Sequence, residues 1–161
     1  GHRAAQGEGG LRLMSDMREL YQEIILDHNK KPRNCYVIDC ATRTADGHNP
    51  LCGDVVKVYL RIEDGVIEEI SFQGDGCAIC TASTSIMTES VKGKSVEEAK
   101  GLFEEFHEML TGVAEEQGVE LGKLQVFEGV REYPVRVKCA TLAWHTLNAA
   151  MDGDDEPATT E

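Results

Sequence analysis

The clearest alternation of apolar and polar residues lies in the middle of the chain, over residues 55–62. One face of the expected strand is apolar, and its members are Val56, Val58, Leu60 and Ile62. Residues 66–73 have a similar composition and follow after Glu-Asp-Gly, which predicts a β-hairpin. A shorter strand is expected at residues 35–41, and residues 42–50 are expected to form a polar loop.

The register of this hairpin depends on the length of its loop. A two-residue turn at residues 64–65 would place the apolar Leu60 opposite Glu69. A three-residue loop with Gly65 in a left-handed bulge keeps the apolar residues together. Burial of the apolar face therefore favours the three-residue loop, with the pairs Val56–Phe72, Val58–Ile70 and Ile62–Val66.

Apolar residues at helical spacing predict the remaining elements. Four helices are expected: one capped by Ser15 or Asp16 and stopped by Pro32, one after a Gly-rich turn within residues 74–94, one after the capping box at residues 95–98, and one starting at Pro134. The order of helix, strands and helices predicts an α+β fold. We expect a small antiparallel sheet of about three strands with the helices packed on one face.

The ends of the chain differ in composition from its middle. A length of 161 residues favours one domain with a substantial core, which we place at residues 14–151. Residues 1–13 are rich in glycine and are interpreted as a flexible arm or a cloning remnant. Residues 152–161 are acidic and almost free of apolar side chains, which predicts a disordered tail.

Charge and cysteine content exclude several classes of function. With 29 acidic against 16 basic residues the net charge is −13, which argues against nucleic-acid binding and against anionic membrane surfaces. No apolar run approaches the ~20 residues of a membrane span, and no signal peptide is recognisable. We therefore expect a cytoplasmic protein with reduced thiols, in which the six cysteines indicate metal or sulfur chemistry before disulfides.

Three cysteines share a local context that suits metal binding. Cys52, Cys77 and Cys139 each lie near the end of an expected element, and Asp54 could add a carboxylate. Such donors suit zinc, and thiolates also hold iron–sulfur clusters. A carboxylate would make the site more labile than an all-thiolate site, although Asp54 could instead cap a turn. His48 is the one histidine retained as a residue that could support the site.

The other readings of the cysteines stay open at this point. Cys77 and Cys80 form a CxxC pair that could act in redox chemistry, but the sequence has no βαβ pattern and Cys80 falls among small apolar residues, as a buried thiol would. Cys35 and Cys40 are expected in the core. Burial alone could explain Cys139, although the nearby basic residues would favour its thiolate.

The three motifs "NPLCGD", "GCAICTAS" and "RVKCATLAW" resemble the cysteine motifs of IscU/SufU-type proteins, and "ELYQEIILDHNKKPRN" resembles their first helix. The similarity spans about residues 15–151. It implies iron–sulfur cluster biogenesis, in which a PLP-dependent cysteine desulfurase supplies sulfur and downstream assembly or acceptor proteins receive it. By motif match, the metal or cluster ligands would be Cys52, Asp54, Cys77 and Cys139.

Two departures from the IscU pattern favour the SufU branch. IscU-type scaffolds carry His-Cys at the third motif, where this chain has Lys138 before Cys139. Residues 92–112 also resemble the helical insertion of SufU-type proteins. The resemblance then implies zinc in the resting site and Cys52 as sulfur acceptor, with Cys139 as the rival. The alternatives are a [2Fe–2S] scaffold of the IscU type and a structural zinc module, so enzymatic sulfur transfer and non-enzymatic assembly both remain open.

Overall fold

The computed structural model describes residues 9–111, 122–153 and 158–159. Its elements in chain order are α1 (Gly9–Lys30), β1 (Arg43–Asn49), β2 (Asp54–Glu63), β3 (Val66–Asp75), α2 (Ala78–Val91), α3 (Val96–Thr111), the 3₁₀ helix η2 (Gly122–Glu132), α4 (Pro134–Asp152) and β4 (Ala158–Thr159). The strands lie in the order β3-β2-β1-β4, with β1, β2 and β3 antiparallel and β4 parallel to β1. The expected α+β fold with a small antiparallel sheet is confirmed.

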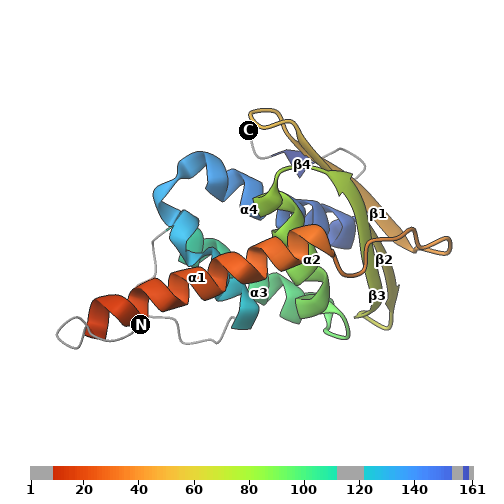
Figure 1. The fold of residues 1–161 in the computed structure, drawn as a ribbon. Helices are drawn as coiled ribbons and strands as arrows, with labels where there is room; N and C mark the ends of the chain where they lie inside the picture. Colours follow the sequence, from red (N-terminus) through yellow and green to blue (C-terminus); the bar gives the residue numbers. More distant parts are fainter. Residues whose placement is uncertain (1–8, 112–121, 154–157, 160–161) are drawn as a thin grey trace.

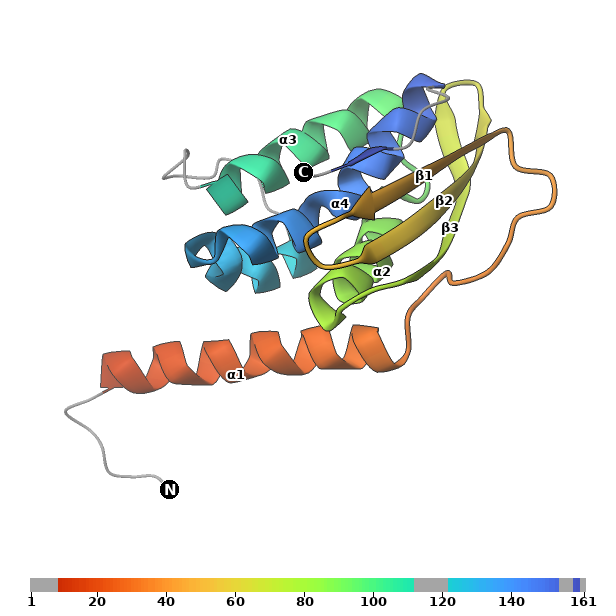
Figure 2. The same cartoon turned by 90° about the horizontal axis from the view of Figure 1, so that it is seen from above.

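The helices cover one face of the sheet (Figures 1 and 2). Helix α4 packs against β1, β2 and α2, and α1 lies along α2 on the side away from α4. The core fills the space between the sheet and these helices, and Trp144, Phe106 and Phe127 are its largest fully buried side chains. Among the helices that the structure describes, none is both long and apolar enough to cross a membrane.

The register predicted for the β2–β3 hairpin is wrong. Asp64 and Gly65 both have positive φ angles, 55° and 76°, so the loop is a two-residue turn of the I′ kind. A bulge between Arg61 and Ile62 then shifts the pairing by one residue, and the register places Ile62 opposite Ile67 and Leu60 opposite Ile70. The bulge therefore buries the apolar face in a way that a regular two-residue hairpin could not.

The first strand was also expected in the wrong place. Strand β1 occupies residues 43–49, which were expected to be a loop, while residues 35–41 form no strand and run over the sheet face away from the helices (Figure 2). Alternate residues of β1 are buried, but they are the small or polar Ala45, Gly47 and Asn49. A Cβ atom at Gly47 would collide with Thr146 of α4, so close packing of the helix selects residues that lack a hydrophobic signal.

The helix boundaries agree with expectation at α3 and α4. Ser95 and Glu98 exchange the two hydrogen bonds of a capping box, at 3.0 and 3.1 Å, and Pro134 is the first residue of α4. Helix α1 begins at Gly9, so the predicted caps at residues 15 and 16 are wrong. Of the expected arm and tail, residues 1–8, 154–157 and 160–161 lie outside the described part, and residues 158–159 pair with β1.

Candidate metal and thiol site

Three elements bring the predicted site residues together. Cys52 and Asp54 lie at the β1–β2 hairpin, Cys77 directly precedes α2, and Cys139 lies in the second turn of α4. The donor atoms of Cys52, Asp54 and Cys139 all lie within 4.8 Å of one another. The two sulfur atoms of Cys52 and Cys139 are 3.4 Å apart. These three residues therefore form a compact S, O, S donor group.

Cys77 adjoins this group through the Asp54 carboxylate. The backbone N–H of Cys77 donates to Asp54 Oδ1 at 2.9 Å, and the Cys77 sulfur lies 3.9 Å from Oδ2. Asp54 is only 1% exposed. A Cβ atom at position 76 would lie 3.0 Å from Asp54 Oδ1, tighter than most real contacts, so Gly76 lets the chain before α2 approach the carboxylate closely. All four residues predicted from the motifs are thus neighbours.

The hairpin turn gives Cys52 a different exposure from Cys139. Gly53 has a φ of 74°, a left-handed conformation that glycine adopts without strain. The N–H groups of Cys52 and Gly53 both donate to the Asn49 carbonyl, at 3.3 and 2.8 Å. Cys52 is half-buried, whereas Cys139 is 0% exposed. Of these two thiols, Cys52 is the one that another molecule could reach.

Cys77 and Cys80, the two cysteines of the CxxC pair, lie in different environments at the start of helix α2. Cys77 is the N-cap of α2, and its sulfur accepts the N–H of Cys80 at 3.4 Å; the positive end of the helix dipole favours negative charge there. Burial, with a further contribution from the charge of Asp54, raises the pKa of the Cys80 thiol to about 12. Cys80 is therefore a buried, protonated thiol, which is unsuited to a reactive CxxC pair.

Asn49 is a site residue that was expected only as part of the polar loop at residues 42–50. Its side chain is fully buried, and Nδ2 lies 3.7 Å from the Cys139 sulfur as a hydrogen-bond donor. Its Oδ1 accepts the N–H of Leu51 at 3.2 Å. The signal that could have revealed it is the alternation Ala45-x-Gly47-x-Asn49, because it places Asn49 on the inner face of β1.

The three thiols and the carboxylate of this site lie so close together that their negatively charged forms would repel one another. Burial raises the pKa of the Cys139 thiol far above its usual value, and the neighbouring Cys52, Asp54 and Cys77 raise it further. Contact with Cys139 in turn raises the pKa of Arg136. A divalent cation would relieve this repulsion and hold the thiols as thiolates. Two thiolates and a carboxylate, with a third thiolate adjacent, fit the donor preferences of zinc.

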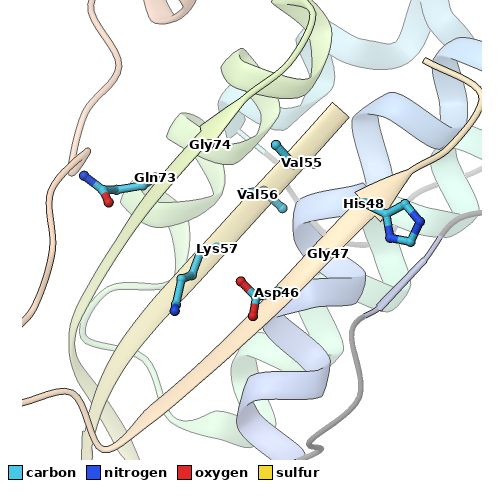
Figure 3. Close-up of a pocket in the computed structure, with 8 residues that line it drawn as sticks. All are labelled: Asp46, Gly47, His48, Val55, Val56, Lys57, Gln73 and Gly74. Carbon is cyan, nitrogen blue, oxygen red and sulfur yellow. The ribbon is translucent and has the colours of Figure 1, made fainter. Parts of the chain in front are cut away.

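The remaining predicted residues lie away from this group. Cys35 and Cys40 are exposed, so their expected place in the core is wrong; the segment that holds them is not a strand. His48 is exposed on the opposite face of β1 from Asn49. It lines a hollow of about 510 Å³ on the outer face of the sheet, together with Asp46, Lys57 and Gln73 (Figure 3). The sheet therefore separates His48 from the thiols.

Comparison with known proteins places the fold and the motifs in one family. Residues 20–153 match the NifU-like N-terminal domain. The zinc-dependent sulfurtransferase SufU of Bacillus subtilis is 36% identical over 85% of this chain and 92% of its own. The iron–sulfur cluster assembly scaffold protein IscU of Streptococcus pyogenes is 40% identical over 86% of both chains.

A solved structure shows the same arrangement. The crystal structure described as that of a "putative iron-sulfur cluster assembly scaffold protein for SUF system" from Fervidobacterium islandicum is 36% identical and superposes with a TM-score of 0.76. The match covers 80% of this chain and 94% of that one. Identity to the SufU and IscU relatives is similar, so the comparisons do not separate the two branches. The chain belongs to the NifU-like N-terminal domain family, the IscU/SufU family of iron–sulfur cluster assembly and sulfur transfer.

Proposed function

We propose that this chain accepts persulfide sulfur from a PLP-dependent cysteine desulfurase at Cys52 and relays it to iron–sulfur assembly proteins. The observation that carries the proposal is the contact between the half-buried Cys52 thiol and the fully buried Cys139 thiol, 3.4 Å apart beside the buried Asp54. One thiol is accessible to a partner, and the other is held in place by the core. This asymmetry favours transfer through Cys52.

Zinc fits the donor group as the resting metal, and the ligand set would be Cys52, Asp54, Cys77 and Cys139. When bound, it would keep the sulfurs deprotonated and leave the ligand bonds exchangeable. The chain's own part is to present Cys52 at an exposed turn while Asn49 holds the turn. Lys138 and the additional helix α3 support the SufU-like reading, because a protonated lysine cannot replace the histidine ligand of IscU-type proteins.

The transfer step is a thiol–persulfide exchange. The Cys52 thiolate attacks the outer sulfur of the desulfurase persulfide, and a new S–S bond forms on Cys52. The S–S bond of the desulfurase breaks, and its cysteine leaves as a thiolate. No net oxidation or reduction takes place, so no further reagent is needed.

The decisive experiment uses the cysteine desulfurase of the same organism. Cys52→Ala is expected to abolish persulfide transfer, measured by mass spectrometry of the recipient, and to abolish stimulation of the desulfurase. Cys40→Ala removes an exposed thiol outside the site and should leave both unchanged. Full persulfide transfer to the Cys52→Ala variant would contradict the assignment. If transfer is lost in Cys139→Ala but kept in Cys52→Ala, the acceptor is Cys139.

The second candidate is an IscU-like scaffold that assembles a [2Fe–2S] cluster, which the three neighbouring thiols and the identity to scaffold proteins also favour. Elemental analysis with a visible absorption spectrum separates the two candidates. A colourless protein with one zinc per chain supports sulfur transfer, whereas bound iron and sulfide with visible absorbance supports the scaffold. A purely structural zinc module would show zinc but no persulfide on any cysteine.

A further inference from the structure

Histidine and glutamate side chains border a hollow between α3 and α4. This hollow of about 270 Å³ is lined by two histidines, two glutamates and a phenylalanine, namely His107, His145, Glu104, Glu108 and Phe103. The two imidazole rings have their centroids 6.2 Å apart and are inclined at 78°. None of these residues belongs to the thiol site, and the hollow's lining residues contribute no sulfur.

Helical spacing and packing hold these groups in place. On α3, the adjacent pair Phe103 and Glu104 lies about one turn before the adjacent pair His107 and Glu108. Helix α4 brings His145 against them. The ring of His145 meets Phe103 edge-on, with the centroids 5.2 Å apart. The side chain of His145 is half-buried and that of His107 is exposed, and both line the hollow from different helices.

The hollow is distinct from the thiol site on the same helix. Cys139 and His145 are six positions apart in α4, which separates them by about 9 Å along the axis and about 240° around it. The donors also differ, because imidazole and carboxylate replace thiolate. A metal bound in one place would therefore not share ligands with a metal in the other.

We propose that this hollow is a second metal site, which binds a divalent first-row transition metal ion through His107, His145 and a carboxylate of Glu104 or Glu108. Imidazole and carboxylate together are donors that zinc and its neighbours accept. Metal–nitrogen bonds are about 2.0–2.1 Å long, and the donor atoms here are spaced more widely than those of the thiol site. Binding therefore requires the exposed side chains of His107 and of one glutamate to move toward His145. The proposal is independent of the sulfur-transfer role.

Trp144 provides a local probe of this site. It is the only tryptophan of the chain and stacks on Phe103, with centroids 5.9 Å apart and planes inclined at 16°. It also precedes His145 directly in α4. Cobalt(II) in the hollow is therefore expected to quench the tryptophan fluorescence, because a paramagnetic ion with open d shells quenches at short range.

The test titrates cobalt(II) into the full chain after one equivalent of zinc has been added to fill the thiol site. We expect quenching that saturates at one cobalt per chain, without the charge-transfer absorption that thiolate–cobalt bonds produce. His107→Gln and His145→Gln should each weaken the apparent affinity by at least about tenfold, since even partners outside the ligand set cost that much. His48→Gln removes an exposed histidine on the far face of the sheet and should change nothing.

Two results would overturn the proposal. One is that cobalt quenches the fluorescence of His107→Gln and of His145→Gln as strongly as that of the unmodified chain, or that it quenches none of them. The imidazoles would then be packing groups only. The other is quenching accompanied by thiolate charge transfer, which would place the cobalt at the cysteines. Because His107 is exposed, its variant keeps the fold, verified by circular dichroism, and it decides the matter if the His145 variant is unstable.

Discussion

Asn49 connects the two cysteines that compete for the role of sulfur acceptor. Its side-chain nitrogen Nδ2 donates to the Cys139 sulfur at 3.7 Å, its side-chain oxygen Oδ1 accepts the N–H of Leu51, and its backbone carbonyl accepts the N–H groups of Cys52 and Gly53. One buried residue thus fixes both the wall of the site and the turn in front of it. Among the residues around the site that are not predicted ligands, Asn49 should therefore tolerate substitution least.

Replacing Asn49 by alanine should destabilise the protein and loosen the site together. Loss of a buried hydrogen-bonding side chain costs about 1–3 kcal/mol of unfolding free energy. The variant keeps the backbone bonds to Cys52 and Gly53 but loses the side-chain bonds to Cys139 and Leu51, which should loosen the site and weaken zinc binding. Urea denaturation and competition with a chelator measure the two effects. Asn148→Ala, at a half-buried position of α4 where alanine suits the helix, is the matched control. An Asn49 variant with unchanged stability and affinity would contradict this role.

At the scale of residues, the sequence points to candidate donors more readily than to the residues that position them. Cys52, Asp54 and Cys139 could be found because metal chemistry restricts ligands to few residue types. Asn49 and Gly76 act through one hydrogen bond and one close approach. Both effects depend on tertiary distances, which a motif does not contain.

The attachment of α1 rests on a buried histidine. His28 is 1% exposed, and its Nδ1 lies 2.7 Å from Ser85 Oγ of α2. Its Nε2 faces Lys123 Nζ at 3.4 Å. Because the ammonium group can only donate, Nε2 must accept and Nδ1–H donates to Ser85. The imidazole is therefore neutral in this arrangement. A second proton on Nε2 would face the Lys123 ammonium group at 3.4 Å, and the Glu89 carboxylate, 3.8 Å away, offsets this only in part.

This arrangement predicts a loss of stability in mild acid. Burial lowers the pKa of His28; the charges of Arg33 and Lys123 lower it further, against smaller opposing contributions from Glu89 and Asp27. The unfolded chain binds the proton more readily, so stability is complete above the ordinary histidine pKa of 6.5 and decreases as the pH falls below it.

The measurement is the free energy of unfolding between pH 8 and pH 5. His28→Gln should flatten the acid side of this curve, while His48→Gln, at an exposed position of β1, should leave it unchanged. His145, whose pKa is also lowered, accounts for part of the remaining slope. An equally steep acid decline in His28→Gln would show that the α1 contact does not titrate as described.

Gly65 occupies a backbone conformation that favours glycine, whereas Gly101 lies in a helix where alanine would fit. Gly65→Ala should destabilise the protein by about 1–2 kcal/mol, because its φ of 76° is left-handed. Gly101→Ala in α3 should stabilise it by roughly 0.5–1 kcal/mol, because alanine favours helices and nothing lies within 4 Å of the added carbon. Thermal unfolding measures both changes. Equal effects at the two positions would refute the turn assignment.

At the scale of elements, the errors arise where packing overrides hydrophobic pattern. Strand β1 was missed because helix α4 approaches it so closely that Gly47 must stand where a strand would normally carry a large side chain. The hairpin register was missed because the turn and the apolar faces demand different pairings. The bulge after Arg61 reconciles them, and no single local preference predicts it.

At the scale of the whole molecule, the sequence determined the layers correctly because they depend on averages over many residues. The apolar stripes of the helices and of β2 and β3 all had to face a common core. The single sheet with helices on one face follows from that requirement alone. The position of the thiol site follows from it as well, since hairpin tip, helix start and helix α4 meet at one end of the core (Figure 2).

Because most of the predicted ligands lie outside the apolar core, we expect the protein to stay folded without metal. The large core side chains, such as Trp144, Phe106 and Leu60, lie between the sheet and the helices, and Cys139 is the one predicted ligand that ranks among the buried apolar core residues of the described chain. Zinc should therefore add stability only by binding the folded state, about 2.7 kcal/mol at a free concentration 100 times its Kd.

Chelation should accordingly lower the thermal midpoint while leaving the far-ultraviolet circular dichroism and the buried Trp144 emission at 25 °C unchanged. Cys52→Ser provides the control, because a variant that has lost a ligand should show little further change in its midpoint on chelation. Cooperative loss of helical signal as zinc leaves, in the way that small zinc domains unfold, would instead make the metal structural. The exchangeable site that sulfur transfer needs would then be ruled out, since a fold that depends on its metal cannot release a ligand to the partner's sulfur.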